Sequence, residues 1–479
     1  MKKIALLIVV FILLALAPFG VKSIIDEQVQ KQTIVLEKKG VKIEVLNSKG
    51  YIKTQREFEL TIKDEVKFKK FLKASFIEKY PTYEGLIDSL IKKDSKAFDE
   101  FLRGIVFKGS INNSNINYNS DINVNIYLYK FSDKIMKKLN ENKDKNQEIL
   151  SFLEKKALAF DLVLSNDASL KKLTLQDIDE NIVSKNSRGQ TSNNDLKILS
   201  FFINNYSQKD LLKAKINLDK FLIKTLTSNK ESILDLNSLV YDFTYLNEYI
   251  NSSNLKLENF LFSVNDINLG VNGVELKSKG EVRSGLYQTK VDLKTNSIEF
   301  SSRKDNLSIE SILFNVKLND ILYDKLKALN TAYINIELIT LDNSLSENEK
   351  KLKLASAIDN LALNIDEVLN NGAGLKANLD VKDLKQTNVS FKNIDLNVDL
   401  FLNKNTLSFK TLNKKEFLSN VDGNIVLVLP KDDFTNFVKL VNPTFGMLLS
   451  VYAKEQENDI LFDVKINKGV ITINDKKLN

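Results

Sequence analysis

Apolar and polar residues alternate with a period of two along much of the chain, which is the spacing of a strand with one buried face. The alternation begins between residues 34 and 64, where two runs in phase suggest a hairpin: Val41, Ile43, Val45, Phe58, Leu60 and Ile62. It returns at 105–131, dominates 197–320, and recurs at 375–409. We therefore expect antiparallel strands joined by tight turns, such as Val271-Asn272-Gly273 and Arg283-Ser284-Gly285.

Helical spacing interrupts this pattern in several places. Asp64 is a predicted N-cap, followed by a helix that Pro81 breaks and by a second helical stretch to about Leu102. Further helices are predicted at 132–156, 346–370 and 431–456, and 184–195 is the clearest flexible loop. The helix at 346–370 carries one apolar stripe, made of Leu354, Ile358, Leu361, Ile365 and Val368.

The long strands with one apolar face outnumber the helices. We therefore predict an α+β fold that is predominantly antiparallel β, in which a transmembrane helix precedes a large curved β-meander sheet with a few covering helices. Such a sheet must cover its apolar face, fold back on itself, or leave a groove. The predicted regions are an anchor at 1–22, an N-terminal periplasmic α+β region at 23–196 and a C-terminal β-rich region at 197–479.

The first residues predict a membrane segment. Residues 4–21 are uncharged and apolar, close to the shortest length that crosses a hydrocarbon core of about 30 Å as a helix. Ala15-Leu16-Ala17 fits a signal-peptidase site, but Pro18 directly after it disfavours cleavage. Retention is therefore favoured, and cleavage stays open. Lys2 and Lys3 keep the N-terminus in the cytoplasm, which places the body in the periplasm of a bacterium.

Composition excludes several kinds of chemistry. The 479 residues include no cysteine and no histidine, so disulfides, thiolate nucleophiles, lipidated cysteines, Ser-His-Asp triads and histidine-based zinc sites are impossible. Carboxylate chemistry, a Ser–Lys pair and oxygen-bound hard cations remain. The net charge of +7 comes from 69 basic and 62 acidic residues without an arginine-rich cluster, so no nucleic-acid partner is predicted.

Neighbouring acidic residues are candidates for a catalytic or metal site, but turn or cap roles explain them more simply. They are Asp177, Asp179, Glu180, Asp432 and Asp433. The last two follow Pro430 and suit the N-cap of a helix beginning "FTNFVKLV". The chain has no phosphate-binding loop, dinucleotide fingerprint, EF-hand or Gly-x-Ser-x-Gly elbow. We therefore assign no catalytic, cofactor-binding or metal residue and no cofactor.

Both ends of the chain resemble one bacterial family. The C-terminal "GMLLSVYAKEQENDILFDVKINKGVITINDKKLN" and the N-terminal "VKIEVLNSKGYIKTQREFEL" are similar to the YdgA-like proteins of unknown function. The chain departs from that family at Asn474-Asp475, where Asn-Gly is usual, and at Lys53-Thr54, where Ser-Ser is usual. The resemblance implies an inner-membrane anchor and a periplasmic β-rich body, and it brings no catalytic residues. Lipid-holding β grooves of AsmA-like proteins are an analogy of fold only.

These observations favour a non-enzymatic protein, held at the inner membrane through residues 4–21, that binds an apolar or extended envelope component along its sheet. The component would be a lipid or an unfolded polypeptide. One alternative is a self-associating envelope scaffold, hence a homo-oligomer. A third hypothesis is a carboxylate-based glycan hydrolase, which needs two acidic groups in one cleft and a raised pKa on one of them.

Overall fold

The structure is a computed structural model of the chain. It describes residues 26–27, 30–31, 33–79, 95–117, 120–141, 143, 147–165, 169–185, 191–207, 211–227, 230–247, 249–342, 345–387, 389–411, 413–440 and 449–478. Within these ranges, no helix has the length and apolar character needed to cross a membrane. The predicted anchor at 1–22 lies outside them.

The chain forms two compact units. The first comprises residues 1–206 and 216–229, and the second comprises 207–215 and 230–479. The boundary predicted at 196–197 was drawn from pattern alone and stays a prediction.

The first unit combines short strands with helices. Its helices are α2 (Glu65–Lys79), α4 (Ser95–Leu102), α5 (Asp133–Glu141) and α6 (Gln147–Glu154). Its strands are β1 (Val41–Lys49), β2 (Lys53–Ile62), β3 (Val106–Ser114), β4 (Ile122–Lys130), β5 (Ala159–Leu164), β6 (Leu170–Leu175), β7 (Ile178–Lys185), β8 (Thr191–Leu199) and β9 (Phe202–Asn205), together with most of β10 (Leu212–Thr227).

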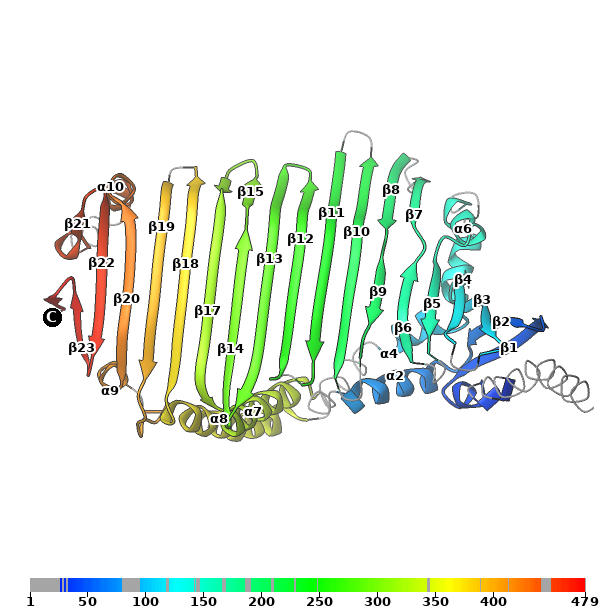
Figure 1. The fold of residues 1–479 in the computed structure, drawn as a ribbon, viewed down its shortest axis with the longest axis horizontal. Coiled ribbons are helices and arrows are strands. Elements are labelled where there is room, and N and C mark those ends of the chain that lie inside the picture. The colour runs from blue at the N-terminus through cyan, green and yellow to red at the C-terminus, as the bar shows by residue number, and fades with distance from the viewer. Residues whose placement is uncertain are drawn as a thin grey trace, which may run out of the picture. The chain divides into compact units, whose positions relative to one another are not determined.

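The second unit is a long antiparallel meander (Figure 1). Its strands are β11 (Lys230–Tyr245), β12 (Asn251–Val264), β13 (Ile267–Arg283), β14 (Leu286–Thr295), β15 (Ser297–Ser301), β16 (Asn306–Ile309), β17 (Ser311–Leu322), β18 (Ala373–Gln386), β19 (Val389–Leu402), β20 (Val421–Pro430), β21 (Lys454–Gln456), β22 (Asp459–Asn467), β23 (Val470–Ile473) and β24 (Lys476–Lys477). Its helices are α7 (Tyr323–Leu341), α8 (Glu347–Asn370), α9 (Lys414–Ser419) and α10 (Lys431–Leu440).

The predicted N-terminal hairpin and the helix after it are confirmed. β1 pairs with β2 so that Ile43 faces Leu60 and Val45 faces Phe58. The Asp64 carboxylate accepts a hydrogen bond from the Lys67 N–H at 3.0 Å, which caps α2. The core of this unit gathers strand and helix residues: Ile62, Leu102, Ile105, Leu128 and Leu153. The predicted break at Pro81 lies outside the described residues.

Three predicted elements are corrected in the first unit and at the C-terminus. The helix predicted at 132–156 is two helices, because α5 ends at Glu141 and α6 begins at Gln147. The loop predicted at 184–195 is mainly strand, since 191–195 pair in register with β7 and the Asn194 amide donates to the Ile182 carbonyl at 3.0 Å. The helix predicted at 431–456 ends earlier, because 454–456 pair with β22 as the short strand β21.

The predicted turn at Val271-Asn272-Gly273 is wrong. β13 runs straight through it and pairs with β12 on both sides. Gly273 has a φ of +63°, so a positive-φ residue sits inside a strand where the sequence suggested a hairpin. The turn at Arg283-Ser284-Gly285 is confirmed, with positive φ at Ser284 and Gly285 between β13 and β14.

Helix α8 confirms the predicted helix at 346–370 and shows how it begins. Ser346 caps it in a reciprocal capping box with Glu349. The predicted stripe is wrong at Ile358. This side chain is 53% exposed, and the neighbouring Ala357 is buried instead. A one-residue shift around a helix moves a side chain by about 100°, so a stripe read from large residues alone misses the alanine that packs closely.

Helix α7 is not predicted by the sequence pattern. In "TAYINIELITL" the residues alternate in a strand-like way, and Ala332 and Ile334 are buried while Tyr333 is exposed. α7 packs against α8, and Lys325 and Glu367 link them at 2.7 Å. Figure 1 shows α7 and α8 at the ends of the long strands and not over their middle.

Candidate functional site

The register of the second unit places its large apolar side chains in rows that cross the strands. Directly opposed residues of an antiparallel pair point to the same face. Following the pairs from β11 to β22 gives one uninterrupted row, which we call the ridge row. Its members are Tyr241, Leu255, Leu276, Leu293, Phe314, Leu379, Leu396, Leu427 and Phe462. At about 4.8 Å per strand, this row is roughly 40 Å long.

The apolar alternation changes phase at one line across the sheet. Successive apolar residues of one face are normally two apart. They are three apart where the line crosses β11, β12, β13, β18 and β19 and at the junction of β16 with β17: Leu236 and Leu239, Leu257 and Phe260, Val271 and Val274, Val381 and Leu384, Phe391 and Ile394, and Ile309 and Ile312. The extra residue lies at matching positions of β11, β12, β13, β18 and β19, so the pairing register continues on both sides of the line. Three residues on this phase line have positive φ, namely Ser238, Gly273 and Asp383.

The apolar residues on the two sides of the phase line lie on the same face. Phe391 belongs to a buried cluster with Phe434 of α10, and Ile394 from the other side of the line packs against the same cluster. Each pairs with an apolar residue of β18, Phe391 with Leu384 and Ile394 with Val381. Because paired residues share a face, the apolar residues on both sides of the phase line lie on one face of the sheet back to β11. We call this surface the apolar face.

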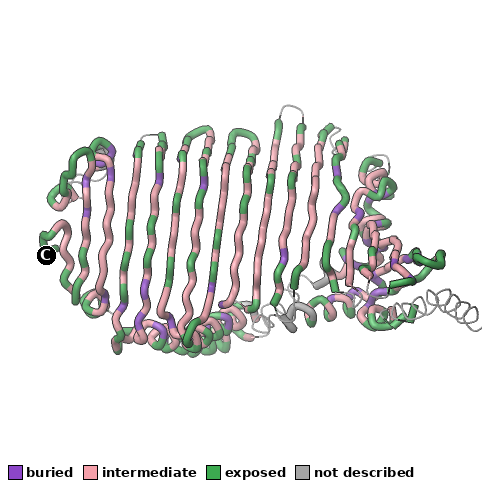
Figure 2. Tube along the Cα trace, viewed as in Figure 1, coloured by how far each residue is buried: buried purple, intermediate pink, exposed green. Residues whose placement is uncertain are grey.

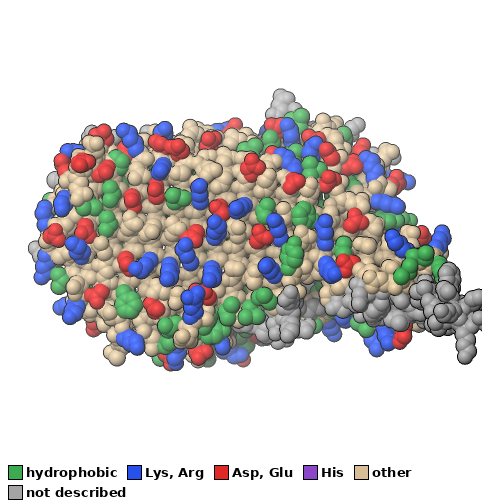
Figure 3. Space-filling model, in the orientation of Figure 1, with side chains coloured by type: hydrophobic (Ala, Val, Ile, Leu, Met, Phe, Trp, Pro, Cys, Tyr) green, Lys and Arg blue, Asp and Glu red, His purple; other side chains and the backbone are tan. Residues whose placement is uncertain are grey.

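The opposite face is mainly polar, with a few apolar side chains such as Leu313 and Phe401. Its rows include Asn254, Lys277, Asp292, Asn315, Asn378 and Asn397, and a second one with Lys279, Lys290, Lys317, Lys376 and Asp399. Neighbouring charges pair on it, such as Lys290 with Asp292 at 2.8 Å and Lys376 with Asp399 at 2.7 Å. A hydrogen bond from Lys277 lowers the pKa of Glu275. Figure 3 shows a charged surface of this kind over the long strands, with few hydrophobic side chains.

Most of the apolar face is only half-buried. The ridge row is intermediate in exposure from Tyr241 to Leu427, and only Phe462, under α10, is buried. Figure 2 shows the same intermediate exposure along the middle of the long strands. Next to the phase line, Thr295 and Val381 are buried. Within the described ranges, the buried hydrophobic clusters lie in the first unit and under α10. The predicted covering helices therefore leave much of this face open.

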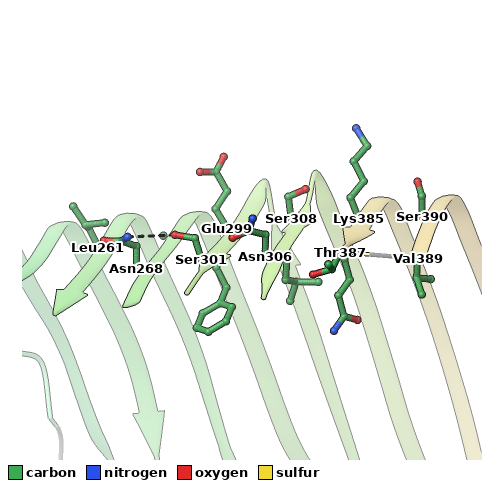
Figure 4. A pocket seen from close by; sticks show the side chains of 14 residues that line it. Leu261, Asn268, Glu299, Ser301, Asn306, Ser308, Lys385, Thr387, Val389 and Ser390 are labelled. Carbon is green, nitrogen blue, oxygen red and sulfur yellow. Dashed lines mark hydrogen bonds between the residues drawn. The ribbon is translucent and has the colours of Figure 1, made fainter. Parts of the chain in front are cut away.

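A hollow of about 880 Å³ lies at the end of the strands away from α7 and α8 (Figure 4). Its lining is mostly small and polar, as with Ser301, Ser308 and Ser390, and Glu299 and Lys385 are its only charged groups. Figure 4 shows Glu299 and Lys385 pointing out of the sheet on separate strands. Glu299 is the single carboxylate of this lining, so the hollow gives no pair of carboxylates.

The candidate carboxylates of the sequence do not converge. Asp177 accepts the Ser200 N–H at 2.7 Å, Asp179 pairs with Lys197 at 2.9 Å, and Glu180 pairs with Lys155 at 2.8 Å. These are turn and surface contacts.

The acidic pair in the second unit is also structural. The predicted N-cap role of Asp432 and Asp433 is wrong. Helix α10 already begins at Lys431, so both residues lie inside its first turn. Asp433 is 5% exposed and accepts a hydrogen bond from the Lys392 N–H, at the phase line. No group of three or more acidic residues placed to hold a metal ion occurs in the described parts of the chain.

The exposed Glu310 has a raised pKa. Glu310 and Asp383 are opposed where β16, β17 and β18 meet, and the hydrogen bond and negative charge of Asp383 raise the pKa of Glu310. Glu310 is exposed, and neither residue lines the hollow of Figure 4. A glycosidase needs its two carboxyl groups to flank a substrate in a cleft, so this pair lacks the setting that the hydrolase hypothesis requires.

The first unit holds a buried polar network that the sequence did not reveal. Arg56 is 2% exposed, and its guanidinium donates to Asp26 and Asn113. Asn115 donates to the Tyr51 carbonyl and the Thr54 hydroxyl, both at 2.6 Å. These groups satisfy one another, so the network is best explained as support for β2 and β3.

Comparison of the chain with models of known protein families, with curated proteins and with solved structures finds no match. The resemblance to the YdgA-like family therefore stays a prediction from the terminal motifs, and the apolar face is the feature from which a function can be argued.

Proposed function

We propose that this protein is a non-enzymatic binder of membrane lipid, which it holds by burying acyl chains against the apolar face. The observation that carries the proposal is the unbroken ridge row from Tyr241 to Phe462, which is half-buried over nearly all its length. Contiguous apolar surface of this extent typically marks a binding site. Each methylene buried there would contribute about 0.8 kcal/mol.

The proposed location follows from the sequence. Residues 4–21 would remain as an inner-membrane anchor, with the body in the periplasm, where lipid and lipid-linked envelope components are available. N-terminal sequencing of the mature protein tests this part alone. A retained Met1 or Lys2 supports the anchor, and a new terminus near Pro18 overturns it.

Binding is tested by two matched double variants of the full chain. Leu379 and Leu396 oppose each other on the apolar face, and Asn378 and Asn397 oppose each other on the polar face. Each pair is changed to glutamate, which adds two like charges at the same strands in both variants. The chains are purified in mild detergent, and co-purified phospholipid is measured by mass spectrometry.

We expect the Leu379→Glu, Leu396→Glu chain to retain at least fivefold less phospholipid than the Asn378→Glu, Asn397→Glu chain. Equal retention in the two variants contradicts the proposal, as does a wild-type chain without lipid. A lipid-free wild-type oligomer in sedimentation would instead support the envelope-scaffold hypothesis. Circular dichroism of both variants checks that the sheet is formed.

A further inference from the structure

The rows of the apolar face differ in height. Beside the ridge row lies a row of smaller side chains, which we call the low row: Ser253, Ser278, Val291, Val316, Ala377, Val398, Ile425 and Val464. On its other side, large side chains return at Leu318, Leu375 and Leu400. From Val316 on β17 to Val398 on β19, the low row therefore runs between two taller rows.

The dimensions of the low row suit one hydrocarbon chain. Same-face rows are about 6.7 Å apart along a strand, and neighbouring strands are about 4.8 Å apart. The apolar part from Val291 on β14 to Val464 on β22 is thus roughly 24 Å long. That exceeds the depth of one acyl leaflet, about 15 Å or half of the ~30 Å hydrocarbon core.

The low row is polar at Ser253 and Ser278 and apolar from Val291 onward, and beyond Ser253 its register continues to Phe243 on β11. The hydroxyls of Ser253 and Ser278 lie 2.8 Å apart. The next row on this face carries two more polar side chains, Asn251 on β12 and Thr289 on β14. From Val291 onward the low row presents only hydrocarbon side chains. This change from hydroxyl to hydrocarbon matches an amphiphile, whose polar group and tail need different surroundings.

We infer that one alkyl chain of a membrane lipid lies across the strands in the low row, with its polar end at Ser253 and Ser278 and its tail toward β22. This inference rests on the proposed function and adds the seat and direction of the ligand. A polypeptide is disfavoured there, because its backbone N–H and C=O groups would lose water over side chains from Val291 to Val464 that offer no hydrogen bond.

The direction is tested with two photoreactive phospholipids and the full wild-type chain. One carries a diazirine near the carboxyl end of an acyl chain, and the other carries it at the terminal methyl. After illumination, labelled residues are mapped by mass spectrometry. We expect the carboxyl-proximal label on β12 to β14, around 251–291, and the terminal label on β19 to β22, around 398–464.

A variant tests the seat itself. Ala377→Phe raises the low row at its midpoint, whereas Asn378→Phe adds the same ring to the polar face one residue away. We expect Ala377→Phe to reduce terminal labelling of β19 to β22 at least fivefold and Asn378→Phe to change it less than twofold. If Ala377→Phe fails to fold by circular dichroism, the label positions in the wild-type chain still decide.

The outcomes separate the two proposals. Both labels spread along one strand, or a terminal label near Ser253, would overturn the low row as the seat while leaving lipid binding intact. Crosslinking confined to other parts of the chain would contradict the proposed function as well. Protein dimers with no lipid label would mean that a second copy covers the apolar face.

Discussion

Phe391 and Ile394 lie three residues apart on β19, yet both pack into the hydrophobic cluster around Phe434. In a regular strand, residues three apart point to opposite faces. Because β11, β12, β13, β18 and β19 each carry one extra residue at this line, these strands keep their pairing while their apolar side chains stay on one face. The phase line is therefore what makes the apolar face continuous.

Gly273 tests the phase line. Its φ is +63°, and a Cβ there would lie 2.1 Å from the side-chain nitrogen of Asn296. We expect Gly273→Ala to lower the free energy of unfolding by about 1–3 kcal/mol, through backbone strain and displacement of Asn296. Gly270→Ala on the same strand is the control, because its Cβ would meet nothing closer than 4.0 Å. Equal midpoints for the two variants in urea unfolding would argue against the strained role of Gly273.

Asp433 connects α10 to the phase line. Its carboxylate is 5% exposed and accepts the Lys392 N–H. Asp433→Ala leaves that N–H without its partner, so we expect a loss of about 1–3 kcal/mol in the free energy of unfolding. The exposed Asp432→Ala should change it by less than about 0.5 kcal/mol. Thermal unfolding of the two variants measures the difference. Similar losses of stability would mean that the negative charge at the start of α10 matters and the hydrogen bond to Lys392 does not.

Glu310 should make stability depend on pH. Asp383 raises the pKa of Glu310, so the folded state holds this proton more tightly than the unfolded chain does. The repulsion is absent below the ordinary glutamate pKa, about 4.3, and develops as the pH rises through the raised value. We therefore expect Glu310→Gln to raise the urea midpoint at pH 7 and to leave it unchanged near pH 3.5.

Glu258→Gln is the control for this pH dependence, because Glu258 is another exposed carboxylate on the phase line. It should show no comparable gain at pH 7. A Glu310→Gln midpoint that rises equally at both pH values would show that repulsion from Asp383 is not the cause.

The sequence predicts the strands well where alternation is long, and it predicts the apolar face itself. Period two is visible on either side of the phase line within 251–264 and 389–402, and the turn at Ser284-Gly285 follows from residues that accept positive φ. The same rule fails at Gly273, because a glycine beside asparagine has the composition of a hairpin turn. Only the pairing on both sides of it reveals a continuous strand.

Other features depend on contacts between distant residues. The phase line becomes visible only when the spacing of three is aligned across neighbouring strands, which needs the register. Whether helices cover the apolar face depends on where the α7–α8 pair packs, and α7 itself looks like a strand in sequence. Likewise, Asp433 and Lys392 are far apart in the chain, so local capping rules assigned Asp433 the wrong partner.

The central claim is that the apolar face holds lipid, and neighbouring residues of β19 test it most directly. A photoreactive benzoylphenylalanine is placed in the full chain at Leu396 on the apolar face or at Asn397 on the polar face, and the cells are illuminated. We predict phospholipid crosslinked at position 396 and little or none at 397. Equal lipid crosslinking at both positions, or none at position 396, would contradict the account.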